Sequence, residues 1–213
     1  IVRVVHHVQW AEGDAHHAVT SAAFAPALKE EFPEIEQAIR ILPEGGGVIS
    51  FENKTIHAGN IFFTDKNVFD VFTFEFLAGI PQNALAEPNT IVITESLAQK
   101  IFGDSKSARN QSIIFEKTLS NKVTGVIKDV PQNSHLRFEA LRSLPEGFTA
   151  GWQDSNLYTY LLLGQNVKKD LLEAKLPQFA QNTILKEMPV ISYKMELQSV
   201  SDIHLHSNLQ YEL

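Results

Sequence analysis

A short stretch near the end of the chain, "SDIHLHSN" at positions 201–208, carries residue types that bind metals. In an extended strand alternate side chains share a face, so His204 and His206 could reach one metal ion with Asp202 on the same side. A zinc site needs three or four protein ligands, and the neighbouring sequence supplies no further one. We therefore keep Asp202, His204 and His206 as metal candidates, and favour the alternative that they are exposed polar groups near a chain end.

Two histidine doublets lie in the first seventeen residues, His6 with His7 and His16 with His17. Adjacent residues of a strand point to opposite faces, which argues against either doublet chelating a metal alone. The chain has no cysteine, so thiolate metal sites, disulfides and cysteine nucleophiles are excluded.

Carboxylates cluster in "KEEFPEIE", and we interpret them as a solvated helix end rather than as acid–base catalysts: Glu30, Glu31, Glu34 and Glu36. The glycines of "EGGG" lack the spacing and the following helix of a phosphate-binding loop, and no nucleophile elbow surrounds a serine. The sequence therefore predicts no catalytic residue, no cofactor and no enzyme activity.

Composition limits the possible partners and architecture. A chain of 213 residues forms one large domain or two small ones, and its net charge of −7, with scattered basic residues, argues against nucleic-acid binding. Its apolar runs are far shorter than the roughly 18–20 residues that cross a bilayer. The chain begins at Ile1 without methionine and without a signal-peptide pattern, so we expect it to be part of a longer protein.

Hydrophobic patterns predict a strand–helix–strand unit at each end and a β-rich middle. The first unit has a strand over 1–10, a polar loop over 11–17 and a helix with Phe24, Leu28 and Phe32 on one face. The second has a strand over 157–164, a helical stretch over 171–179 and a strand over 191–200. Between them, three glycines at 45–47 are expected to end any regular element.

The clearest local unit is "TIVITESLAQKIFG", a strand followed by a helix that Thr94 should cap and Gly103 should end. Just before it, four phenylalanines in eight residues are expected to belong to the core: Phe69, Phe72, Phe74 and Phe76.

An ordered series of segments resembles one family. "NVFDVFTFEFLAGIPQNALAEPNTIVITESLAQKIFGD", then "VTGVIKDVPQNSHLRFEAL", then "DIHLHS" follow the pattern of the extracytoplasmic domain of MacB/FtsX-like ABC transporter permeases of the Bacteroidetes type, over about residues 30 to 207. The segment "GDSKSARNQ" departs from the "P.GK" turn of relatives, which puts that loop's conformation in doubt.

The resemblance implies an α+β fold in two parts. A porter-like subdomain of βαβ units would combine residues 1–48 and 152–213, and an inserted β-rich, sabre-like subdomain would span 49–151. In relatives the domain is inserted between the first and second transmembrane helices of the permease, which implies a periplasmic domain of a multi-pass inner-membrane protein. "SDIHLHSN" would then lie where the chain returns to the membrane.

The resemblance also implies a non-catalytic role in export or mechanotransmission, in which ATP hydrolysis in the cytoplasm drives a conformational change outside. The implied partners are a cognate cytoplasmic ATPase, a second permease copy and a periplasmic adaptor or other envelope protein. The alternative from another class is a periplasmic ligand- or metal-binding module.

Overall fold

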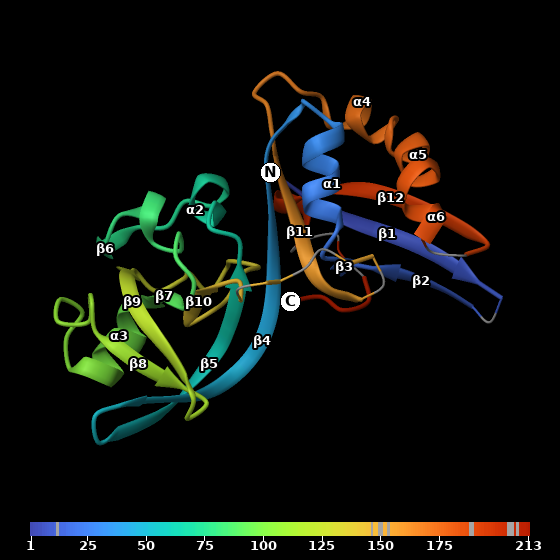
Figure 1. Cartoon of the computed structure of the whole chain (residues 1–213). Helices are drawn as coiled ribbons and strands as arrows, with labels where there is room; N and C mark the ends of the chain where they lie inside the picture. The colour runs from blue at the N-terminus through green and yellow to red at the C-terminus, as the bar shows by residue number, and fades with distance from the viewer. Residues whose placement is uncertain are drawn as a thin grey trace. The chain divides into compact units, whose positions relative to one another are not determined.

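The computed structural model divides into two compact units, Ile1–Arg40 with Thr149–Leu213, and Ile41–Phe148 (Figure 1). It describes residues 1–11, 13–145, 147–148, 151–152, 154–187, 190–203, 207 and 209–213. In this part of the chain, no helix is long and apolar enough to cross a membrane.

The first unit is a sheet with helices packed on one face. Its strands lie in the order β12-β1-β11-β4, with β2 beside β1 and β3 beside β11. The strands are β1 (Val2–Trp10), β2 (Gly13–His17), β3 (Thr20–Ser21), the start of β4 (Ile35–Phe51), β11 (Ser155–Leu163) and β12 (Ser192–Ser199). The helices are α1 (Phe24–Glu31), α4 (Lys169–Glu173), α5 (Leu176–Phe179), a π-helical turn Ala180–Ile184, α6 (Leu185–Glu187) and a 3-10 turn Val200–Asp202.

The core of this unit lies between the helices and one face of the sheet. Phe24 and Leu28 of α1 and Phe179 of α5 pack against Val4 of β1 and Leu197 of β12. The expected helix face is therefore confirmed, with Phe32 just beyond the helix end. Residues Val2–His6 of β1 are buried on both faces of the sheet. That burial accounts for Val2, Val4 and Val5, although the polar residues Arg3 and His6 are buried there too.

The second unit is a smaller mixed sheet with α3 packed against it. Its strands lie in the order β4-β5-β10-β7-β9-β6, with β8 beside β4 and β9. Among the strand pairs of the described residues in this unit, β5/β10 and β7/β9 are parallel and the others antiparallel. Its elements are the end of β4, β5 (Lys54–Thr64), α2 (Val68–Val71), β6 (Phe76–Ala78), a 3-10 turn Pro81–Asn83, β7 (Thr90–Thr94), α3 (Glu95–Phe102), β8 (Ser112–Phe115), β9 (Leu119–Ile127) and β10 (Ala140–Ser143).

Local signals for α3 are confirmed. The Thr94 hydroxyl accepts a hydrogen bond from the Leu97 amide at 3.4 Å, and Gly103 closes the helix with a left-handed φ of 85°. Leu97 and Ile101 are buried in the core of the second unit. The four phenylalanines before this helix are only half-buried. Phe69 contacts Phe74 and Phe76 edge-on, Phe74 also contacts Phe138, and Phe72 lies against His135 instead.

Two expectations from local sequence are wrong. Residues 13–17, expected as a loop, form β2, because their backbone pairs with β1 and a polar strand is stable when its neighbours supply the hydrogen bonds. The three glycines do not end an element, since β4 continues through them with register shifts beside Gly45. Gly45 has a φ of +80°, so glycine allows a bulge there instead of a stop.

Candidate functional site

Several polar residues of the first unit lie on the sheet face opposite the helices. On β1, Arg3, Val5 and His7 alternate onto this face, which we call the polar face. Strand pairing places Glu196 of β12 opposite Val5 and His16 of β2 opposite His7. The polar face thus combines side chains that are far apart in the sequence.

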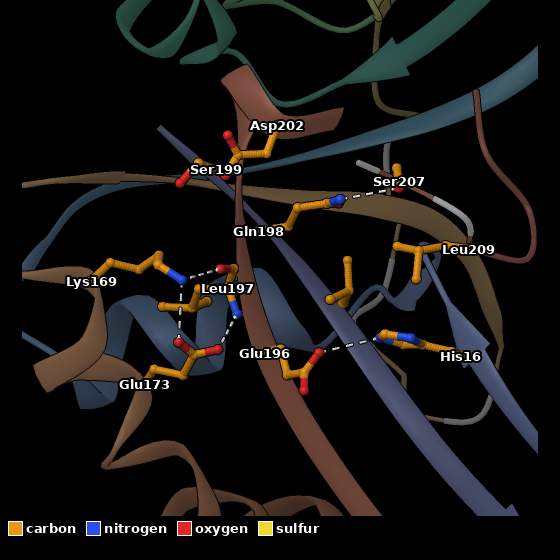
Figure 2. Close-up of a pocket in the computed structure, with 11 residues that line it drawn as sticks. His16, Lys169, Glu173, Glu196, Leu197, Gln198, Ser199, Asp202, Ser207 and Leu209 are labelled. Carbon is orange, nitrogen blue, oxygen red and sulfur yellow. Dashed lines mark hydrogen bonds and ion pairs between the residues drawn. The ribbon is translucent and has the colours of Figure 1, made fainter. Parts of the chain in front are cut away.

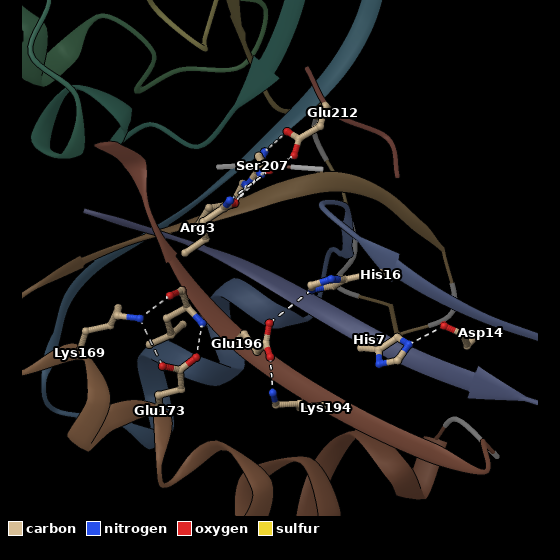
Figure 3. A network of polar contacts seen from close by, with 12 residues as sticks. Arg3, His7, Asp14, His16, Lys169, Glu173, Lys194, Glu196, Ser207 and Glu212 are labelled. Atoms are coloured by element: carbon tan, nitrogen blue, oxygen red, sulfur yellow. Dashed lines mark hydrogen bonds and ion pairs between the residues drawn. The ribbon is translucent and has the colours of Figure 1, made fainter. Parts of the chain in front are cut away.

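Arg3 is the buried centre of a partly buried polar network (Figure 3). Its guanidinium is fully buried and forms an ion pair with Glu212, with Nη1 2.7 Å from Oε2 and Nη2 2.9 Å from Oε1. It also donates to the side chains of Gln198 and Ser207, at 2.6 Å and 3.2 Å from Nη2. Such charge-assisted, bidentate geometry is the strong form of an arginine–carboxylate contact.

Glu212 belongs to the C-terminal segment, residues 209–213, which this network fixes to the sheet. Burial raises the pKa of Glu212, but hydrogen bonds from Arg3 and Ser207 outweigh burial and leave the pKa below its ordinary value. The segment also pairs through its backbone with β2, because the Gln210 amide donates to the His16 carbonyl at 2.9 Å and the Ala18 amide donates to the Gln210 carbonyl at 3.1 Å. The two ends of the chain are therefore joined within one unit.

The two histidine doublets meet across the β1–β2 pair. His6 lies opposite His17 and His7 opposite His16, with ring centroids 5.6 Å and 5.8 Å apart. The sequence prediction treated each doublet alone and missed this pairing, because residues 13–17 were expected to form a loop. The closeness in sequence of two segments able to pair as neighbouring strands, 2–10 and 13–17, is the signal that could have revealed it.

His6 is buried on the helix-covered face. Its Nδ1 lies 3.0 Å from the Tyr193 hydroxyl, and its ring contacts that of Phe24 edge-on. Burial, reinforced by the neighbouring His17, lowers the pKa of His6 to about 4. Burial also lowers the pKa of His17, so both histidines of this pair are neutral at pH 7.

A cavity of about 330 Å³ opens on the polar face beside β12 (Figure 2). Residues Glu196–Ser199 of β12 line it, together with Lys169 and Glu173 of α4, His16 of β2, and Asp202. Hydrogen bonding from Lys194 lowers the pKa of Glu196, which is therefore ionised at neutral pH.

α4 is attached to the outer edge of β12 at one residue. The Leu197 amide donates to Glu173 at 2.9 Å, and Lys169 donates to the Leu197 carbonyl at 3.1 Å. Lys169 and Glu173 also pair with each other at 3.4 Å. This arrangement satisfies the backbone of an edge strand and forms one wall of the cavity.

Of the metal candidates, Asp202 lies exposed at the end of the 3-10 turn, where its Oδ1 accepts a hydrogen bond from Ser201 at 3.3 Å. His204 and His206 lie outside the described residues. Among the residues that the structure does describe, no three His, Asp or Glu side chains are placed to hold a metal ion. Glu30 and Glu31 are exposed, and Glu34 pairs with Lys175.

The family model of the MacB-like periplasmic core domain matches residues 2–179. The chain belongs to this family. It is a MacB-like periplasmic domain of the kind found in ABC transporter permeases, as the ordered sequence segments predicted. No curated protein sequence matches the chain significantly.

Solved structures show the same fold as this MacB-like domain. A domain of a protein described as a permease from Porphyromonas gingivalis is 24% identical, with a TM-score of 0.79 over 92% of this chain and 88% of that one. The periplasmic region of MacB from Actinobacillus actinomycetemcomitans is 15% identical, with a TM-score of 0.63 over 94% and 90%.

A third structure, the extracellular domain of the noncanonical ABC-type transporter YknZ from Gram-positive bacteria, is 12% identical, with a TM-score of 0.62 over 93% of this chain and 99% of that one. The predicted α+β, MacB-like fold is confirmed, and the Porphyromonas gingivalis structure fits the predicted Bacteroidetes type.

Proposed function

We propose that this MacB-like domain is a non-catalytic coupling element of a permease. In this proposal, ATP hydrolysis by a separate cytoplasmic ATPase moves the membrane helices, and the domain carries the movement to a substrate or partner outside the membrane. Membership of the family supports this context.

The observation that carries the proposal is the connection between the two ends of the chain. Arg3, close to the start, is bound to Glu212, close to the end, and Gln210 is paired with β2. In relatives the domain is inserted between two transmembrane helices, so these ends are the parts nearest the membrane. A displacement of either helix would then act on the whole first unit, because a bidentate ion pair with a fully buried guanidinium resists separation.

We also propose that the two units correspond to the two subdomains of the family. Ile1–Arg40 with Thr149–Leu213 would be the porter-like part, and Ile41–Phe148 the sabre-like part. The proposed partners are the ATPase, a second copy of the permease, and an adaptor or other envelope protein that contacts the domain. The alternative of a ligand-binding module is favoured by one observation, the cavity beside β12.

The absence of cysteine from these residues permits a direct test in the full-length permease with its ATPase. Arg3→Met breaks the ion pair. In that variant, His17→Cys with Gln210→Cys introduces a disulfide that joins the C-terminal segment to β2, at a position where the two backbones already pair. The measurement is hydrogen–deuterium exchange of the domain with and without ATP, in detergent or nanodiscs.

We expect the ATP-dependent change in exchange to be present in the wild type, lost in Arg3→Met and restored when the disulfide is formed in that variant. Reduction of the disulfide should abolish the recovery, which serves as the internal control. An Arg3→Met permease that keeps the full ATP-dependent change contradicts the proposal, as does a disulfide that fails to restore it in a folded domain.

A further inference from the structure

Another cavity, of about 340 Å³, lies in the second unit, and we call it the β9 cavity. Lys122 and Thr124 of β9 line it, whereas Val123, between them, packs in the core that includes α3. The cavity is therefore on the face of β9 that points away from this core. Two loops form its walls, residues 80–88 and residues 109–110. Its size suits one small ligand or one side chain.

Hydrogen bonds to the strands hold the 80–88 wall in place. The Thr90 hydroxyl donates to the Glu87 carbonyl at 2.6 Å, and the Thr124 hydroxyl donates to the Ala84 carbonyl. Because both hydroxyl protons are used in this way, the threonines attach the wall to β7 and β9 and have no proton to offer a ligand. The β9 cavity is thus formed before a ligand binds, which lowers the free-energy cost of binding.

A β-bulge forms the other wall. Asn110 has a φ of 68°, its amide donates to the Val123 carbonyl at 2.8 Å, and the Val123 amide donates to the Gln111 carbonyl at 2.9 Å. Asn110 and Gln111 therefore both lie opposite Val123, and a bulge of this kind changes the direction of nearby side chains. Arg109 and Asn110 line the cavity from here. Both belong to "GDSKSARNQ", the segment whose conformation the sequence left in doubt.

Arg109 and Lys122 bring two positive charges to the β9 cavity. Both residues are exposed, so a ligand can reach them. Within the part of the chain that the structure describes, neither side chain has an ion-pair or hydrogen-bond partner. Arg142 of the same unit is, by contrast, paired with Glu44 at 2.6 Å. Like charges that line one cavity repel each other, and an anion bound between them removes that repulsion.

Glu87 limits the negative charge that the β9 cavity can accept. Its carboxylate lines the cavity together with Arg109 and Lys122, so two cations against one anion leave a formal charge of +1. A single negative charge neutralises this lining. A carboxylate carries one negative charge, whereas a phosphate group carries about −1.5 to −2 at neutral pH. The balance of charges therefore favours a carboxylate.

We propose that the β9 cavity binds a carboxylate group on a short aliphatic arm, held by Arg109 and Lys122. A guanidinium can donate two parallel hydrogen bonds to a carboxylate, and an ammonium group adds a further charge-assisted contact. Ile80, Ala84 and Pro88 supply apolar surface for the arm, and Ile80 is 54% exposed. The carboxylate belongs either to a free acid or to an acidic side chain of a bound peptide. The inference does not depend on the proposed coupling function.

The test is an NMR titration of the 213-residue chain, following the backbone amides of Asn110 and Thr124. The probes are butyrate, N-acetyl-glutamate methylamide, inorganic phosphate and, as the matched neutral ligand, N-acetyl-glutamine methylamide. We expect both carboxylate probes to shift these amides, and the glutamine probe to bind at least about tenfold more weakly. Tighter binding of butyrate indicates a free acid as the ligand, and tighter binding of the blocked glutamate indicates a peptide side chain.

Variants then identify the residues of the site. Arg109→Gln should weaken the carboxylate probes about tenfold, and Lys122→Gln about threefold, since a charge-assisted contact is lost in each. Glu87→Gln should strengthen binding about threefold, because it removes a carboxylate that repels the ligand. Lys186→Gln, which removes a positive charge from an exposed position of α6 outside the cavity, should have no effect.

Any one of five results overturns the inference. The titrations contradict it if the glutamate and glutamine probes bind equally, if phosphate binds more tightly than both carboxylates, or if the shifts are confined to amides outside the β9 cavity. The variants contradict it if both Arg109→Gln and Lys122→Gln keep the wild-type affinity, or if Glu87→Gln weakens binding. Retained amide spectra of the variants exclude misfolding as the cause of any loss.

Discussion

His6 lies opposite His17 in the antiparallel pair of β1 and β2, with ring centroids 5.6 Å apart and the His6 ring buried beneath α1. Protonation of these imidazoles destabilises the folded strand pair, because a charge on the buried His6 ring is poorly solvated and two charged rings repel each other. The first unit is therefore sensitive to acid at a strand pair that also holds the C-terminal segment through Gln210.

The first prediction is a loss of stability between pH 6.5 and 4. The pKa of His6 is about 4 in the folded chain and about 6.5 when unfolded, so the unfolded chain binds more protons in this range. The free energy of unfolding therefore has its full value above pH 6.5, and the protonation of His6 lowers it by about 3 kcal/mol as the pH decreases to 4. His17 acts in the same direction. The check is the free energy of unfolding in urea from pH 4.5 to 8.

His6→Phe should remove most of this slope, leaving a pH dependence smaller by about 2–3 kcal/mol between pH 8 and 4.5. The unpaired Tyr193 hydroxyl lowers the stability of this variant at every pH without restoring the slope. His57→Phe, at an exposed position of β5, is the control and should keep the wild-type slope. Parallel curves for wild type and His6→Phe would show that His6 is not the titrating group.

The second prediction concerns the ion pair between Arg3 and Glu212. Arg3→Met leaves the carboxylate without its main partner in a site where Glu212 is only 29% exposed, and should destabilise the first unit by about 3 kcal/mol. Glu212→Gln keeps an acceptor for Arg3 but leaves the fully buried guanidinium without a counter-charge, so it should cost a similar amount. The measurement is native-state hydrogen exchange of the β1 amides.

Lys128 and Glu75 provide the comparison for this pair. They also lie 2.7 Å apart, but their side chains are 54% and 62% exposed. Lys128→Met should therefore change stability by no more than about 0.5 kcal/mol. Equal costs for Arg3→Met and Lys128→Met would mean that burial does not strengthen the Arg3 contact.

The third prediction concerns Arg142, which has the same role in the core of the second unit. Its guanidinium lies between the rings of Phe63 and Phe115, 4.4 Å and 4.6 Å from their centroids, and donates to Glu44 and Asn121. Lysine cannot stack or donate in this forked geometry, so Arg142→Lys should still cost about 2 kcal/mol, as seen in hydrogen exchange of the β10 amides. Arg109→Lys, at an exposed position, is the control and should leave the stability unchanged. If Arg142→Lys also leaves the stability unchanged, the positive charge alone is sufficient at this position.

Local signals in the sequence predicted α3, because its cap and its end depend on residues within one helix. The α+β fold was predicted from the ordered family segments. The contacts of the polar face could not be predicted in the same way. Arg3 and Glu212 are 209 positions apart, and the partners of His16 depend on a strand register that no local pattern specifies. The prediction that the glycines at 45–47 end an element was wrong for a related reason. Glycine is compatible with both a strand end and a β-bulge, and the pairing of β4 with β5 decides between them.

The fourth prediction uses α3 to separate side-chain capping from backbone strain. Thr94→Ala removes the acceptor for the Leu97 amide and should cost about 1 kcal/mol. Gly103→Ala places a Cβ where no atom lies within 4 Å, so its cost, also about 1 kcal/mol, comes only from the φ of 85°. Gly103→Asn should recover part of that loss, because asparagine tolerates left-handed backbone better than alanine does. Urea unfolding of the three variants measures these differences, and a Gly103→Asn variant less stable than Gly103→Ala would contradict the assignment to backbone conformation.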